Sequence, residues 1–220
     1  MYLTRFEINT ARRDARGLLA SPQRLHAAVL AAFPSTGHGR DDVGRLLWRL
    51  DQHDHQTLLY LASPDRPDLT HLVEQAGWPT QHGWVTRDYS PLLDRLARGQ
   101  RWGFRLKANP VSSRRKTEDS PRSQRFPHVT VSQQTDWLLS RVEKLGFTIV
   151  PGVHDEPDVA LRKRDLLKFA RKGHTVTLAT AVFEGCLEVT DPVALRCAMV
   201  RGIGAGKGYG CGLLTLAPIG

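Results

Sequence analysis

Six glycines fall within fourteen residues near the C-terminus, in the stretch RGIGAGKGYGCGLL at residues 201–214. Glycine lets backbone N–H groups approach an anion closely, so the stretch predicts either a phosphate-binding loop or a tight connection that needs positive φ. Neither common nucleotide motif fits. Gly208 follows Lys207 where a P-loop needs Ser or Thr, and the dinucleotide pattern meets Lys207 or Tyr209 where it needs glycine. A nucleotide cofactor is therefore not expected.

Histidine is the side chain best suited to proton transfer near neutral pH. His26 lies in the early turns of a predicted helix, beside the apolar stripe of that helix, which favours exposure next to a neighbouring surface. A metal site is the other possibility for histidine in this chain, in the turn DQHDHQ. No H-E-x-x-H or C-x-x-C pattern supports it, so no metal is predicted. The residues it would use are Asp51, His53, Asp54 and His55.

Positive charge is in excess, with 31 Lys and Arg against 22 Asp and Glu and a net charge of +9. An excess of this size favours a polyanionic partner. Two segments, 101–125 and 162–172, concentrate it. The second lies on a hairpin predicted at about 159–189, which could follow a phosphate backbone. The candidate contacts are Arg101, Arg105, Lys107, Arg162, Lys163, Arg164, Lys168, Arg171 and Lys172.

The predicted elements that position these residues follow a strand–helix–strand–strand–helix–strand order. Residues 1–8, 44–50, 57–62 and 100–110 are expected to be strands, and 21–33 and 89–99 to contain helices. This order is that of a ferredoxin-like domain. A similar order follows after a segment rich in Ser, Pro and charge. The predicted fold is therefore α+β with two tandem ferredoxin-like domains, at 1–110 and 126–220, joined by a linker or mobile loop at 111–125.

No apolar run approaches the length of a membrane span, and the N-terminus has no secretory pattern. The three cysteines, Cys186, Cys197 and Cys211, show neither an even count nor a C-x-x-C spacing. A reducing, cytoplasmic setting without membrane contact is expected.

The segment GIGAGKGYGCGLLTLAP resembles the glycine-rich signature of CRISPR repeat-processing endoribonucleases, in which two G-h-G triplets (h apolar) are separated by five residues. The segments MYLTRFEIN, FRLKANP, VFEGCLEVTDP and RLHAAVLAAFP resemble the CasE family, which cuts precursor CRISPR RNA in type I-E Cascade. The resemblance runs almost end to end. It implies the tandem ferredoxin-like (RRM-like, RAMP) fold.

The resemblance implies that His26 is the catalytic histidine and that Gln23 stands where better-known members carry an active-site tyrosine. It also implies a CRISPR repeat stem-loop as substrate, retention of the cleaved RNA, and other Cascade subunits as partners. Such an enzyme needs no metal, because the RNA 2′-OH attacks the adjacent phosphate and leaves a 2′,3′-cyclic phosphate and a 5′-OH. His26 could act as base or as acid.

Lys207 is the candidate for stabilising the charged phosphate, and Arg24, Gly204, Gly206 and Gly208 are further candidate RNA contacts. Because Gln23 replaces the tyrosine, a catalytically silent RNA-binding subunit of the same fold is the alternative.

Overall fold

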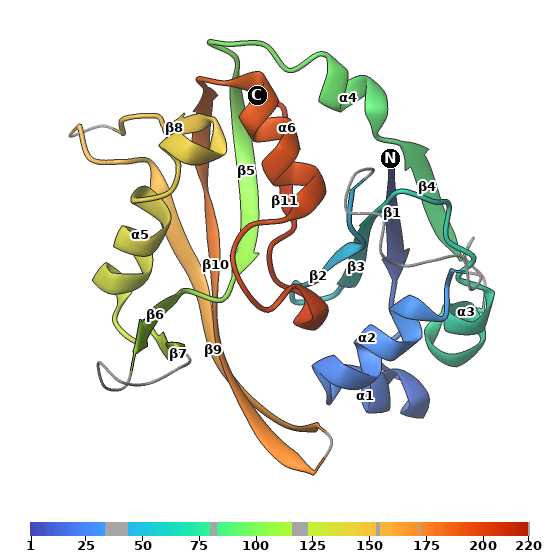
Figure 1. Ribbon diagram of the computed structural model, residues 1–220. Helices are drawn as coiled ribbons and strands as arrows, with labels where there is room; N and C mark the ends of the chain where they lie inside the picture. The colour runs from blue at the N-terminus through green and yellow to red at the C-terminus, as the bar shows by residue number, and fades with distance from the viewer. Residues whose placement is uncertain (34–43, 80–82, 116–122, 153–154, 172, 220) are drawn as a thin grey trace.

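The first sheet has four antiparallel strands in the order β2-β3-β1-β4. The computed structural model describes residues 1–33, 44–79, 83–115, 123–152, 155–171 and 173–219 (Figure 1). The sheet's order, with helices between β1 and β2 and between β3 and β4, is the ferredoxin-like arrangement. Its elements are β1 (Tyr2–Glu7), α1 (Arg13–Leu19), α2 (Pro22–Leu30), β2 (Leu47–Gln52), β3 (Thr57–Ser63), α3 (Thr70–Ala76) and β4 (Trp84–Asp88).

Helix α2 forms where the sequence predicted a helix. Ser21 is its N-cap residue and Pro22 occupies the first turn, where a missing N–H costs nothing. Leu25 and Val29 are buried against the first core, and the neighbouring His26 is only partly buried. Thus α2 turns its apolar stripe inward and leaves His26 at its edge.

The strand at 101–108 was predicted to close the first sheet, and this prediction is wrong. The strand is β5 (Arg101–Ala108), and it pairs with β10 and β11 in the second sheet. The reason lies in its alternating apolar face, which packs into the second core through Trp102, Phe104, Leu106 and Ala108. The fourth strand of the first sheet is instead the short, polar β4, so the boundary between the halves lies between Asp88 and Arg101.

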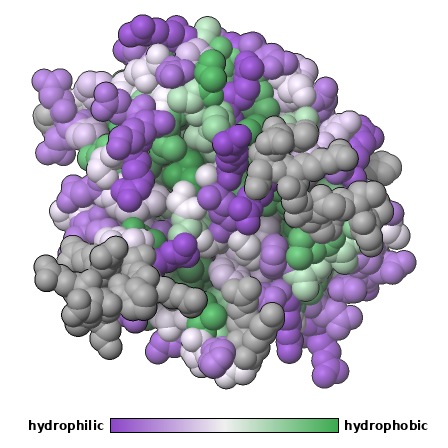
Figure 2. Space-filling view, in the orientation of Figure 1, coloured by the Kyte–Doolittle hydropathy of each residue, from purple (hydrophilic) through white to green (hydrophobic). Residues whose placement is uncertain are grey.

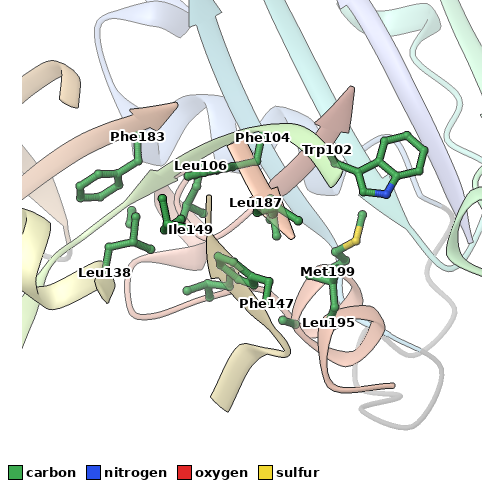
Figure 3. Packing of buried hydrophobic residues seen from close by; sticks show 14 of the residues in the cluster. Trp102, Phe104, Leu106, Leu138, Phe147, Ile149, Phe183, Leu187, Leu195 and Met199 are labelled. Carbon is green, nitrogen blue, oxygen red and sulfur yellow. The ribbon is translucent and has the colours of Figure 1, made fainter. Parts of the chain in front are cut away.

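The second sheet repeats the ferredoxin-like order as β11-β5-β10-β8, with β9 added along β10. Its core gathers side chains from this sheet and from α5 and α6, and Figure 3 shows aromatic and aliphatic side chains facing one another there. Short helix α4 packs against the same core through Leu93. The elements are α4 (Ser90–Asp94), α5 (Val131–Leu139), η1 (Glu143–Leu145), β8 (Phe147–Ile149), β9 (Val159–Arg171), β10 (His174–Val189), α6 (Pro192–Arg201), η2 (Lys207–Tyr209) and β11 (Leu214–Ala217). The tandem fold is therefore confirmed.

The segment predicted as a linker is largely paired where the structure describes it. Strand β6 (Val111–Arg115) pairs antiparallel with β7 (Ser123–Pro127). Residues 116–122, between the two strands, lie outside the described part of the chain. The ends of this segment therefore form an insertion in the second half and do not join two domains.

The predicted hairpin at 159–189 is confirmed as β9 and β10, whose far end extends beyond the rest of the second sheet (Figure 1). A register shift between Val182 and Phe183 leaves Arg162 as an extra residue on β9. None of the described helices is long and apolar enough to span a membrane. Most residues on the face shown in Figure 2 are hydrophilic, and hydrophobic residues show between them in smaller groups.

Candidate active site

The glycine-rich segment after α6 wraps over β2, the edge strand of the first sheet. A Cβ at Gly202 would lie 2.6 Å from Cδ2 of Leu47, and one at Gly210 would lie 2.6 Å from the Trp48 ring. Both glycines also have positive φ, +77° and +78°. A side chain at either position would therefore be strained and would collide with β2. In Figure 1 this segment lies between the two halves, close to β2 and α2.

The imidazole of His26 lies directly against this loop. A Cβ at Gly208, in η2, would stand 3.3 Å from Nε2 of His26. Gly208 does not have a positive φ, so here glycine provides room for the imidazole and not an unusual backbone. Since α2 belongs to the first half and η2 to the second, the site exists only where the two halves meet.

The two predicted neighbours of His26 on α2 point to different places. Gln23 lies one helical turn before His26, on the same face, and is partly buried. Arg24 is exposed, and its Nη1 lies 3.9 Å from the position of a Cβ at Gly17 in α1. Gln23 therefore shares the face of His26, and Arg24 lies beside α1.

Lys207 is partly buried, and its Nζ donates a hydrogen bond to the Gly204 carbonyl at 2.8 Å. Its aliphatic chain packs against Gly202, where a Cβ would lie 3.0 Å from Cε. Burial, with smaller contributions from the positive charges of Arg45 and Arg125, lowers the pKa of Lys207. Sequence reasoning missed Arg45, a single arginine at the start of a predicted strand, with no cluster to mark it.

The other predicted loop glycines shape the first turn of the loop. Gly204 and Gly206 have φ of +75° and +79°. Gly204 packs on the Trp137 ring, and Gly206 packs on Asn109, which is buried and forms an isolated β-bridge to Ala205. Asn109 was not predicted as part of the site, although it stands in the motif FRLKANP.

The hairpin carries exposed cations and reaches the loop through an aromatic contact. The rings of Phe169, on β9, and Tyr209, in η2, have centroids 4.8 Å apart. Neither ring was predicted to take part, although Tyr209 is the one aromatic residue between the loop glycines. The contact places the far end of the basic hairpin, near its turn, beside the loop that contacts His26.

The predicted cations of the hairpin differ in their contacts. Lys168 is exposed, whereas Nε of Arg164 donates to Gln134 at 3.0 Å. Lys163 donates to Gln52 of β2 at 3.1 Å, and Arg162 pairs with Glu184 at 3.0 Å. The Arg171 side chain and Lys172 lie outside the described part of the structure.

In the first predicted basic cluster, at 101–125, the described candidates Arg101, Arg105 and Lys107 each have different contacts. Arg101 pairs with Glu188 at the start of β5, whereas Asn109, just after β5, bridges to the loop. Arg105 is held between Asp51, whose Oδ1 lies 3.3 Å from its Nε, and Glu184. Lys107 is partly buried, and its carbonyl accepts the Gly212 N–H at 2.7 Å.

One of the two aspartates in the turn considered for a metal site, Asp51, pairs with arginines instead. Asp51 is buried and pairs with Arg49 at 2.8 Å, whereas His53, Asp54 and His55 are exposed. Among the described residues, no three His, Cys, Asp or Glu side chains converge as a metal site would require.

Comparisons with known proteins identify the family of this chain. Residues 1–218 match the family described as CRISPR associated protein. The chain is 32% identical over 99% of its length to the whole of the CRISPR-associated endoribonuclease Cse3 of Thermus thermophilus. It is 33% identical over its whole length to the whole of the CRISPR system Cascade subunit CasE of Escherichia coli.

Solved structures of these proteins share the fold. Cse3 bound to a 19-nucleotide RNA superposes with a TM-score of 0.81 at 31% identity, covering 99% of this chain and 100% of that one. Cse3 bound to an RNA representing a pre-cleavage complex gives a TM-score of 0.76 at 30% identity, with coverage of 99% and 98%. The chain therefore belongs to the CRISPR-associated protein family, in the group that contains Cse3 and CasE.

Proposed function

We propose that the protein is an endoribonuclease that cuts precursor CRISPR RNA at the repeat stem-loop and stays on the product as a subunit of Cascade. The observation that carries this proposal is the contact between His26 of the first half and Gly208 of the second. The relatives named as an endoribonuclease and as a Cascade subunit support it, as do the Cse3 structures with bound RNA.

The reaction needs only the RNA and a proton donor and acceptor. The 2′-oxygen attacks the neighbouring phosphorus, a P–O2′ bond forms, and the P–O5′ bond breaks. A base removes the 2′-OH proton, an acid protonates the leaving 5′-oxygen, and the products carry a 2′,3′-cyclic phosphate and a 5′-OH. His26 serves as one of these two groups, and such catalysis contributes about 10²–10⁴-fold to the rate.

Other residues around the loop are suited to hold the phosphate. Lys207 brings a positive charge to the loop, and the loop glycines let RNA approach the backbone. Exposed hairpin cations such as Lys168 are suited to the phosphates of the stem, because A-form duplexes are bound largely through phosphates and shape. Gln23 can donate or accept a hydrogen bond, but its amide cannot replace the acidic phenol of a tyrosine.

Cleavage of the cognate repeat RNA in single-turnover conditions tests the proposal. We expect His26→Ala to lower the cleavage rate at least about 10²-fold while the Kd for RNA stays within about threefold. EDTA should leave the wild-type rate unchanged, and the products should carry cyclic phosphate ends. His53→Ala is the matched control, since His53 lies in an exposed turn, and it should cut at the wild-type rate.

Two results would contradict the proposal in different ways. Undiminished cutting by His26→Ala would remove His26 from the mechanism. Tight binding by the wild-type protein with intact RNA after long incubation would favour the silent RNA-binding subunit, the alternative that Gln23 raises.

A further inference from the structure

Arg49, on edge strand β2, connects the two sheets from a buried position. Its side chain is 3% exposed, and its Nε and Nη2 donate to the two carboxylate oxygens of Asp51 at 2.8 and 2.9 Å. Its Nη1 donates to two carbonyls of the second half, those of Arg105 at 2.9 Å and Leu213 at 3.1 Å. One guanidinium thus binds its own strand and the second sheet in a fixed planar geometry.

The Leu213 carbonyl marks the point where the glycine-rich loop ends and β11 begins. The residue before it is Gly212. The N–H of Gly212 donates to the Lys107 carbonyl at 2.7 Å, and the Gly212 carbonyl accepts the N–H of Ile203 at 2.9 Å. These bonds close the base of the loop. The hydrogen bond from Arg49 therefore attaches the closed base of the loop to β2.

Three consecutive residues of β2 hold the loop at three points. Leu47 packs under Gly202, Trp48 packs under Gly210, and Arg49 binds Leu213. The first two contacts are apolar and have little directional preference. Of these three contacts only the third is directional, and it lies at the end of the loop, as the hydrogen bond from the Arg45 N–H to the Val200 carbonyl, at 3.0 Å, lies before its start.

A buried ion pair of this kind contributes little to stability in comparison with apolar residues of similar size. Its geometric demand is strict, because each charge must keep its partners once it has left water. The contacts continue across the second sheet, since Arg105 lies beside Asp51 and pairs with Glu184, which pairs with Arg162 at the base of the hairpin.

We infer that Arg49 is a positioning residue: held by Asp51, its guanidinium fixes the end of the glycine-rich loop on β2 and thereby sets Gly208 against His26. The kinetic part of this inference rests on the proposed function. It does not require Arg49 to contact RNA, which its burial prevents.

The decisive variant is Arg49→Met/Asp51→Leu, which removes both charges together and leaves Arg105 paired with Glu184. We expect its single-turnover cleavage rate at saturating RNA to fall about 10²-fold, the cost of a small misplacement at a reacting centre. The Kd for the stem-loop should stay within about threefold, since the hairpin is unchanged. Arg49→Lys should likewise slow cleavage and leave the Kd nearly unchanged, because one ammonium cannot bind the carboxylate and both carbonyls.

The matched control is Arg196→Met/Asp94→Leu. Arg196 likewise pairs with an aspartate, at 3.5 Å, and donates to a backbone carbonyl, that of Leu93 at 3.0 Å, but in α6 and away from β2. This control should cut and bind RNA like the wild-type protein. Wild-type cutting by folded Arg49→Met/Asp51→Leu or by Arg49→Lys would overturn the inference.

Hydrogen–deuterium exchange tests the same inference without cleavage. The amides of Ile203 and Gly212 should exchange at least about tenfold faster in the Arg49 variants, while those of β1 keep their protection. If the wild-type protein cuts no RNA, the proposed function fails, and the exchange experiment still decides the inference. Unchanged exchange at the base of the loop would overturn it.

Discussion

At the level of single residues, the loop glycines have two separable purposes. Gly208 leaves room for the His26 ring, whereas Gly210 combines a positive φ with close contact to Trp48. Substitution by alanine should therefore affect chemistry at one position and stability at the other.

We predict that Gly208→Ala lowers the cleavage rate about tenfold or more, because its methyl group would displace the imidazole, and that it changes the free energy of unfolding little. Gly210→Ala should lower the free energy of unfolding by about 2–4 kcal/mol through backbone strain and overpacking. Single-turnover cleavage and urea denaturation of both variants check this. Equal loss of stability in the two would contradict the distinction.

Lys207 gives the site a predicted pH dependence. Burial holds the pKa of Lys207 below its ordinary value of 10.5, so the folded protein loses this charge at a lower pH than an exposed lysine would. The affinity for RNA should therefore fall as the pH rises through that lowered pKa. Lys207→Arg should remove this fall, since arginine stays protonated.

Binding of a stem-loop with a 2′-deoxy nucleotide at the cleavage site, measured as the pH is raised from neutral within the range in which the RNA stem stays paired, tests the effect without cleavage at that site. The same pH dependence in wild type and Lys207→Arg would exclude Lys207 as its source.

At the level of elements, the long hairpin is the predicted phosphate-binding surface. Lys168→Ala should weaken RNA binding and make the slope of log affinity against log salt shallower by about 0.7–0.9, the value for one lost phosphate contact. Lys144→Ala, an exposed lysine in η1, should leave the slope unchanged. Equal slopes for wild type and Lys168→Ala would place Lys168 outside the interface.

Local sequence patterns suffice to predict some helices and strands, but not which sheet a strand joins. Leu25 and Val29 mark α2 because helical periodicity is read from neighbouring residues. The pattern of β5 likewise predicts a strand, but nothing in it says which sheet the strand joins. That depends on pairing with β10 and β11, about 80 and 110 residues later in the chain.

For the whole molecule, the interface between the halves contains a buried ion pair, Arg49 and Asp51. Arg49→Met alone should lower the free energy of unfolding by about 3–5 kcal/mol, because Asp51 then keeps a buried charge without its main partner. Arg49→Met/Asp51→Leu should recover most of that loss. Thermal and urea unfolding of the three proteins measure it, and equal stability of the single and double variants would contradict this account.

The sequence by itself determined helix α2, the basic hairpin and the glycine-rich loop, because each is a local pattern of residue types, and the family resemblance added His26 as the candidate histidine. It did not predict α1, α3 or β4. Tertiary structure alone decided that His26 meets Gly208, that Asp51 binds Arg49 and lies beside Arg105, and that Arg49 holds Leu213. These contacts join residues up to 182 positions apart. They form only when two sheets pack together, and no local periodicity encodes that packing.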